Sequence, residues 1–144
     1  MRRTIETAIE IRASTQRVWE ILRATNAYTE WNPFVRSIEG VFERGKTIKV
    51  VLQQPGGGSF TVKPVMLNAI FPEIRWKGRL LLDGLFDGEH YFRVEALSAH
   101  STRFVHGEHF SGILIGLMSG LLKKTDRGFA LMNGALKKRA EAKD

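Results

Sequence analysis

The sequence predicts an α+β fold in which an antiparallel sheet of six or seven strands curves around one long C-terminal helix. Residues 34–110 are short β segments separated by turn residues, and residues 112–141 carry apolar side chains at helical spacing. The connections between the β segments are shorter than the crossovers that parallel strands need, so we expect antiparallel pairing. The final helix, about 45 Å long, is the element that can cover the buried face of the sheet.

The first part of the chain predicts one strand and two short helices. Residues 5–11 alternate apolar and polar side chains, which is typical of a half-buried strand. Ser14 suits the N-cap of an amphipathic helix over residues 15–23. A second short helix is predicted over residues 27–31, where the following Asn-Pro pair ends it.

The middle of the chain predicts six further strands. Its strongest turn is the glycine-rich stretch 54–59, which we interpret as the tip of a hairpin. The predicted strands cover residues 34–39, 47–53, 60–69, 73–82, 89–97 and 102–110.

Length and composition exclude several classes of protein. A chain of 144 residues predicts one domain, residues 1–144. Hydrophobic residues at 43% and charged residues at 26% exclude a disordered chain. The absence of cysteine excludes disulfides, thiolate metal sites and a cysteine nucleophile. The N-terminus lacks the apolar region of a signal peptide, and the longest apolar run, residues 110–122, is too short to cross a bilayer. We therefore expect a cytoplasmic protein with no transmembrane segment.

The net charge of +7 is concentrated toward the C-terminus. Residues 123–144 carry seven basic and three acidic side chains, including Lys137, Lys138 and Arg139. Such an end can contact an anionic membrane or a protein, or can simply be a solvated helix face. The sequence contains no element suited to enter a nucleic-acid groove and no exposed stacking aromatics, so we expect no nucleic-acid partner.

Short segments along nearly the whole chain carry a family resemblance. They include Ile9-Glu10-Ile11-Arg12-Ala13-Ser14, Trp31-Asn32-Pro33-Phe34-Val35, Trp76-Lys77-Gly78, Gly88-Glu89-His90-Tyr91-Phe92, Glu108-His109-Phe110-Ser111-Gly112 and Met132-Asn133-Gly134-Ala135-Leu136-Lys137. In this order they resemble the START-like superfamily, also called SRPBCC or polyketide cyclase/dehydrase-like. The resemblance implies the helix-grip (START/Bet v 1-like) fold, a curved antiparallel sheet of about seven strands around the C-terminal helix, with two short helices after the first strand.

The resemblance also implies an apolar cavity between sheet and helix, occupied by a small hydrophobic molecule that is lipid-, polyketide- or sterol-like. No cofactor is expected. Ligand sites are mostly apolar, so aromatic and aliphatic side chains are the candidates to line this cavity, although the same side chains can instead fill the core. They are Trp31, Phe34, Trp76, Phe92, Phe104, Phe110, Leu114, Leu117, Met118 and Leu121.

Three polar side chains, His90, His106 and Glu108, are candidates for catalysis. His106 and Glu108 share one face of a predicted strand with Phe104 and Phe110, and we expect His90 on the inner face of the preceding strand. An imidazole and a carboxylate that converge in apolar surroundings can act as acid and base. The alternative is a structural hydrogen bond. Because His106 and His109 point to opposite faces, we expect no metal site.

These observations leave three functions open. The first is a protein that binds a small hydrophobic ligand without catalysis. The second is a metal-independent cyclase or dehydratase, a lyase that uses Glu108 with His90 or His106 as acid and base. The third is a module that contacts a membrane or a protein through the basic C-terminal helix. Either a monomer or a homodimer is compatible with the sequence.

Overall fold

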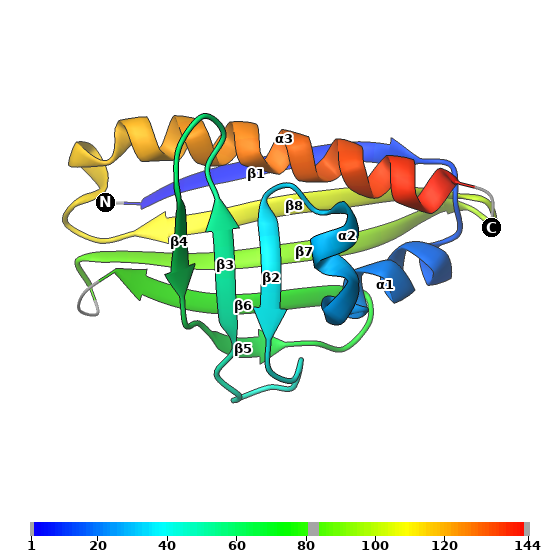
Figure 1. The fold of residues 1–144 in the computed structure, drawn as a ribbon, viewed down its shortest axis with the longest axis horizontal. Coiled ribbons are helices and arrows are strands. Elements are labelled where there is room, and N and C mark those ends of the chain that lie inside the picture. The colour runs from blue at the N-terminus through cyan, green and yellow to red at the C-terminus, as the bar shows by residue number, and fades with distance from the viewer. Residues whose placement is uncertain (1, 81–83, 143–144) are drawn as a thin grey trace.

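The computed structural model describes residues 2–80 and 84–142 and confirms the predicted α+β class (Figure 1). The predicted end of one strand, residues 81–82, lies outside the described residues. Short 3₁₀ turns cover Thr25–Ala27 (η1) and Ile115–Leu117 (η2). The helices are α1 (Thr15–Arg23), α2 (Tyr28–Trp31) and α3 (Ser119–Glu141). The strands are β1 (Arg2–Ile11), β2 (Val35–Glu39), β3 (Lys49–Gln53), β4 (Ser59–Val62), β5 (Val65–Asn68), β6 (Glu73–Leu80), β7 (Phe86–Ser98) and β8 (Ser101–Ser111).

The strands form two antiparallel sheets. The larger has the order β1-β8-β7-β6-β5, and the smaller has the order β2-β3-β4. In Figure 1 the smaller sheet crosses in front of the larger one, and α3 runs along the side formed by β1. The core lies between these three layers, because each sheet buries one face and α3 buries one stripe.

The predicted strand 60–69 is divided into β4 and β5, which belong to different sheets. The division falls at Pro64, which has no backbone N–H and cannot continue a ladder as a donor. The Pro64 carbonyl still accepts a hydrogen bond from the Ile48 N–H at 2.9 Å. This single break explains why the fold has eight strands instead of the predicted seven.

The predicted helix over residues 112–141 begins later, at Ser119. Gly112 adopts a φ of +127° beside the backbone of Leu85, a conformation and a contact that exclude other residues. The chain therefore turns at this point before α3 starts. The helical spacing of apolar residues in 112–141 would place Leu117 on the buried stripe, but its side chain is 81% exposed, so that expectation is wrong. The stripe of α3 that is buried consists of Leu122, Gly128, Phe129, Met132, Asn133, Leu136 and Ala140.

The predicted helix N-cap at Ser14 is confirmed, since its hydroxyl accepts from the Arg17 N–H at 3.2 Å. The same arginine ties α1 to the end of α3. Its guanidinium donates to the carbonyls of Ala140 at 2.6 Å and Ala142 at 3.0 Å, which lack partners inside the helix. These hydrogen bonds hold α1 against the C-terminal end of α3.

Candidate functional site

Five side chains form a continuous hydrogen-bonded chain on the inner face of the larger sheet. Glu108 Oε1 lies 3.1 Å from His90 Nδ1, and His90 Nε2 lies 2.8 Å from His106 Nε2. His106 Nδ1 lies 2.9 Å from Oδ1 of Asn133 on α3. Asn133 Nδ2 donates to the Thr7 hydroxyl at 2.8 Å, and that hydroxyl donates to the His106 carbonyl at 3.0 Å. We call this series the polar chain.

Strand register explains how three of these side chains meet. His90 in β7 pairs with Glu108 in β8, so both side chains lie on the same face. Phe92 pairs with His106 one step further along the same two strands. The convergence expected of His90, His106 and Glu108 is therefore what the structure contains.

Aromatic rings enclose the two imidazoles. The Phe129 ring is stacked on His106 with centroids 3.9 Å apart, and the Trp76 ring is stacked on His90 at 5.0 Å. Phe92 contacts both imidazoles edge-on. His90, His106 and Asn133 are buried, so their polar atoms depend on one another for hydrogen bonds.

The hydrogen bonds of Thr7 and Asn133 assign a tautomer to His106. The single Thr7 proton is used on a carbonyl, so Thr7 accepts from the Asn133 amide and the Asn133 oxygen faces His106. His106 Nδ1 therefore carries a hydrogen. Burial lowers the pKa of His106 well below its usual value, and the neighbouring His90 lowers it further, against an opposing contribution from the Asn133 hydrogen bond. His106 is thus neutral at pH 7, with an unprotonated Nε2.

At the other end of the polar chain, His90 and Glu108 then share one hydrogen. Since His106 Nε2 is an acceptor, His90 Nε2 must carry a hydrogen and donate it. The contact between His90 Nδ1 and Glu108 Oε1 also needs one hydrogen, because two lone pairs would repel each other. That hydrogen belongs either to an imidazolium beside a carboxylate or to a carboxylic acid beside a neutral imidazole. Both arrangements contain the same number of protons.

Glu108 is the accessible end of the polar chain. Its side chain is 17% exposed, and Oε2 makes no hydrogen bond with the described part of the chain. The carboxylate lies over Gly88, where a side chain would collide with Oε2. Gly88 pairs with Gly78 of β6, so the inner face beside Glu108 has no side chains at two adjacent positions.

Glu108 also lies where two apolar clusters of the core adjoin each other. The larger cluster contains Phe34, Phe92, Phe104 and Phe129. The smaller contains Phe86, Phe110, Ile115 and Leu122. Ile5 packs against both clusters and pairs with Glu108 across β1 and β8.

The residues predicted to line a cavity are distributed over different environments. Four of them, Phe34, Trp76, Phe92 and Phe104, are buried in the larger cluster around the imidazoles. Phe110 belongs to the smaller cluster, and Leu114, Met118 and Leu121 pack against it while remaining partly exposed. Leu117 points away from both clusters, as its exposure shows. Trp31 is partly buried beside the larger cluster.

Two surface hollows lie elsewhere, and neither is lined by His90, His106 or Glu108. One of about 170 Å³ is lined by Arg17, Glu20, Ile21, Ala24, Ala27, Trp31 and Arg139. The other, about 420 Å³, is on the outer face of the sheet and is lined by Arg2, Thr4, Lys77, Asp87, Glu89, His109, Phe110 and Ser111. His109 lies on the outer face of the sheet, opposite to His106, as predicted. Its Nδ1 forms a hydrogen bond with the Thr4 hydroxyl at 2.9 Å. Among the described residues, no three His, Asp or Glu side chains are grouped to hold a metal ion.

Sequence reasoning missed three contributors to the site: Asn133, Thr7 and Phe129. The alternation of β1 already places Thr7 on the inner face, and this signal could have identified it. Asn133 and Phe129 lie four residues apart on α3, so they share one face. A polar residue within a helical apolar stripe, such as Asn133 beside Met132, is the signal that was available.

The protonation scheme predicts a definite imidazole tautomer. We expect ¹⁵N NMR at pH 7 to show a protonated Nδ1 on His106 and a protonated Nε2 on His90. In Asn133→Ala, His106 loses the acceptor that selects its tautomer, and we expect both tautomers to be populated. Asn26→Ala, at an exposed position, is the control. A wild-type His106 protonated at Nε2 would contradict the scheme.

The lowered pKa of His106 also predicts how stability depends on pH. Below about pH 6.5 the unfolded chain protonates this histidine while the native state does not, so acidification stabilises the unfolded state. We expect the free energy of unfolding to fall between pH 7 and pH 5, by up to about 1.4 kcal/mol per pH unit from this group.

The glutamine variant separates this contribution from the rest. His106→Gln keeps a donor and an acceptor but cannot titrate, so its unfolding free energy from urea denaturation should depend less steeply on pH. His100→Gln replaces an exposed histidine and should leave the slope unchanged. Equal slopes in wild type and His106→Gln would show that His106 titrates alike in both states.

Comparisons with known proteins agree with the fold. The profile of the family described as polyketide cyclase/dehydrase and lipid transport matches residues 2–141. A search of curated protein sequences finds no match. The description of the family agrees with the START-like resemblance seen in the sequence, which is thereby confirmed.

Several solved structures share the architecture at low sequence identity. The Zhui aromatase/cyclase from Streptomyces sp. R1128 has a TM-score of 0.76 at 17% identity, over 98% of this chain and 94% of that one. A START superfamily protein from Mycobacterium smegmatis has a TM-score of 0.72 at 18% identity, over 96% and 97%. Norcoclaurine synthase from Thalictrum flavum, in complex with dopamine and hydroxybenzaldehyde, has a TM-score of 0.74 at 15% identity, over 100% and 90%. These likenesses establish the helix-grip fold, and the profile match shows that the chain belongs to the polyketide cyclase/dehydrase and lipid transport family.

Proposed function

We propose that this protein binds a small, mainly apolar molecule on the inner face of the larger sheet, with an oxygen of that molecule at Glu108. The observation that carries this proposal is a carboxylate between two apolar clusters, one oxygen of which has no hydrogen bond to residues 2–80 or 84–142. Apolar sites that hold a few well-placed polar groups are the usual form of a small-molecule site.

The packing of α3 supports one placement of the ligand. Phe129 contacts Phe34 with ring centroids 5.6 Å apart, and a side chain at Gly128 would collide with the Phe34 ring. The larger cluster is therefore closely packed, and Phe34, Phe92 and Phe104 act there as core. We place the ligand on the Glu108 side, against the partly exposed Leu114, Met118 and Leu121 and next to Phe110.

Catalysis is a second candidate function, favoured by the contact between His90 and Glu108. A proton held between His90 and Glu108 can be given to a carbonyl oxygen or to a departing hydroxyl group. After this transfer, the same pair can accept a proton from a carbon next to a carbonyl. This is the acid and base chemistry of a cyclase or dehydratase, performed without a metal.

The third function considered from sequence, contact through the basic C-terminal end, gains less support. Lys137 donates to the Glu10 carbonyl at 3.0 Å and to Glu141, and Arg139 donates to Glu30 at 3.0 Å. Two of the three cations are therefore engaged within the chain.

Ligand binding can be tested with 2-naphthol, an apolar bicyclic molecule with one hydroxyl group. We expect NMR titration to shift signals of His90 and Phe110. Gly88→Ala should displace the carboxylate without unfolding the chain, since the atom it meets is the end of a flexible side chain. The loss of a hydrogen bond to a charged group predicts binding about tenfold weaker.

Two results would count against this binding site. The first is an unchanged affinity in Gly88→Ala. The second is a set of shifts confined to the outer face around His109. Gly58→Ala, in the hairpin turn where a Cβ meets no other atom, is the control for substitution of glycine.

Acid and base catalysis can be tested with 2-tetralone, whose protons next to the carbonyl exchange slowly with deuterium oxide. We expect the protein to accelerate this exchange, as measured by ¹H NMR. Glu108→Gln should reduce the acceleration by about 10²- to 10⁴-fold, the usual contribution of general acid and base catalysis. Glu43→Gln changes an exposed glutamate and should retain the rate. Binding of 2-naphthol without any exchange would support the binding function alone.

A further inference from the structure

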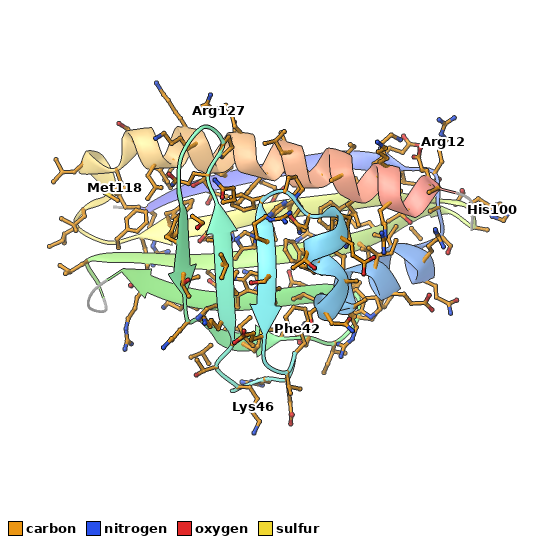
Figure 2. The ribbon with its side chains drawn as sticks, viewed as in Figure 1. Arg12, Phe42, Lys46, His100, Met118 and Arg127 are labelled. Carbon is orange, nitrogen blue, oxygen red and sulfur yellow. The ribbon has the colours of Figure 1, made fainter. Side chains whose placement is uncertain are left out.

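The loop before α3 exposes two large apolar side chains that the proposed function does not use. Ile113 is 74% exposed and Leu117 is 81% exposed. With the exposed cations Arg2, Arg3, Lys123 and Lys124, residues 112–118 form what we call the basic apolar tip. Figure 2 labels Met118 at this end of the molecule.

The exposure of Ile113 and Leu117 is built into the backbone. The Ile113 N–H donates to the Gly84 carbonyl at 3.2 Å, and the Leu114 N–H donates to the Leu85 carbonyl at 3.0 Å. The η2 turn then directs Ile115 into the smaller cluster, where it is 1% exposed. Its neighbours two positions away on each side are consequently held toward solvent.

Four cations lie in the segments next to this loop, and one acidic residue, Asp87, pairs with Ser111 at its start. Arg2 pairs with Ser111 and Arg3 pairs with Phe110, so both arginines lie beside the start of the loop. Lys123 and Lys124 follow in the second turn of α3. The sequence has no acidic residue in 2–5 or in 111–125, so these stretches together contribute four positive charges.

The start of α3 adds hydrogen-bond donors to the same end. No side chain caps this helix, and its first turn contains no acidic residue. The N–H groups at a helix start carry partial positive charge and favour anions such as phosphate. Apolar, cationic and donor groups are thus gathered at one end of the molecule.

We propose that the basic apolar tip docks on an anionic phospholipid bilayer. Ile113 and Leu117 would insert at the boundary between headgroups and acyl chains, while Arg2, Arg3, Lys123 and Lys124 contact lipid phosphates. The attachment is peripheral, because no helix among the described residues is long and apolar enough to cross a bilayer. This inference does not depend on the ligand proposed above.

Co-sedimentation with vesicles tests the docking. We expect the purified 144-residue chain to bind vesicles of phosphatidylcholine with phosphatidylglycerol, and to bind phosphatidylcholine alone weakly. Lys123→Gln with Lys124→Gln should weaken binding about fivefold for each lysine, and added salt should weaken wild-type binding. Ile113→Ser with Leu117→Ser should weaken it roughly tenfold or more.

Matched controls distinguish the tip from general charge and apolar character. Ile70→Ser replaces a side chain that is 77% exposed, next to Phe71, which contacts Trp19 of α1. Lys46→Gln with Lys138→Gln removes two exposed lysines outside the tip (Figure 2 labels Lys46). Both controls should bind vesicles as the wild type does, and all variants should melt at similar temperatures.

Three outcomes would overturn the proposal. One is the absence of binding to anionic vesicles by the wild type. Another is an equal loss of binding in the control variants. The third is a dimer in analytical ultracentrifugation that Ile113→Ser with Leu117→Ser dissociates, without a change in vesicle binding, because the tip would then be a surface for self-association.

Discussion

The hydrogen bond between His106 and Asn133 is the constraint on which the site depends. It joins the larger sheet to α3 in a region where water does not reach, and a buried polar atom left without a partner there would cost about 1–3 kcal/mol. The bond therefore favours the one rotation of α3 about its axis that brings Asn133 to His106. With that rotation fixed, Phe129 lies on the His106 ring and Gly128 faces Phe34. The hydrogen bond between His106 and Asn133 thus contributes both to the packing of the core and to the tautomer of His106.

The two apolar clusters have different consequences for function. The larger encloses both imidazoles in aromatic rings, which excludes water and keeps His106 neutral. The smaller is built from the end of β8 and the start of α3, where several apolar side chains stay partly exposed. Glu108 lies where the two meet. The structure thus combines a closely packed half around the imidazoles with a half whose apolar side chains stay partly exposed, where we place the proposed ligand.

Much of this arrangement follows from the sequence, because strand alternation has a fixed period. The inner position of His90, His106 and Glu108, and the outer position of His109, depend on that period and on antiparallel pairing. The role of Asn133 does not follow, since the rotation of a helix is decided by tertiary contacts. The exposure of Leu117 escaped prediction for a related reason. Helical spacing assigned it to the buried stripe, but Gly112 delays the start of α3.

The closed end of the polar chain limits what chemistry it could serve. Asn133 and Thr7 do not exchange protons near neutral pH, and the Thr7 hydrogen is committed to a backbone carbonyl. Protons can therefore enter and leave the polar chain only through the Glu108 carboxylate. A reaction at this site must therefore return to Glu108 any proton that Glu108 has given to the substrate. The catalysis proposed above is therefore limited to isomerisations, ring closures and eliminations, in which the substrate gives back every proton that it takes.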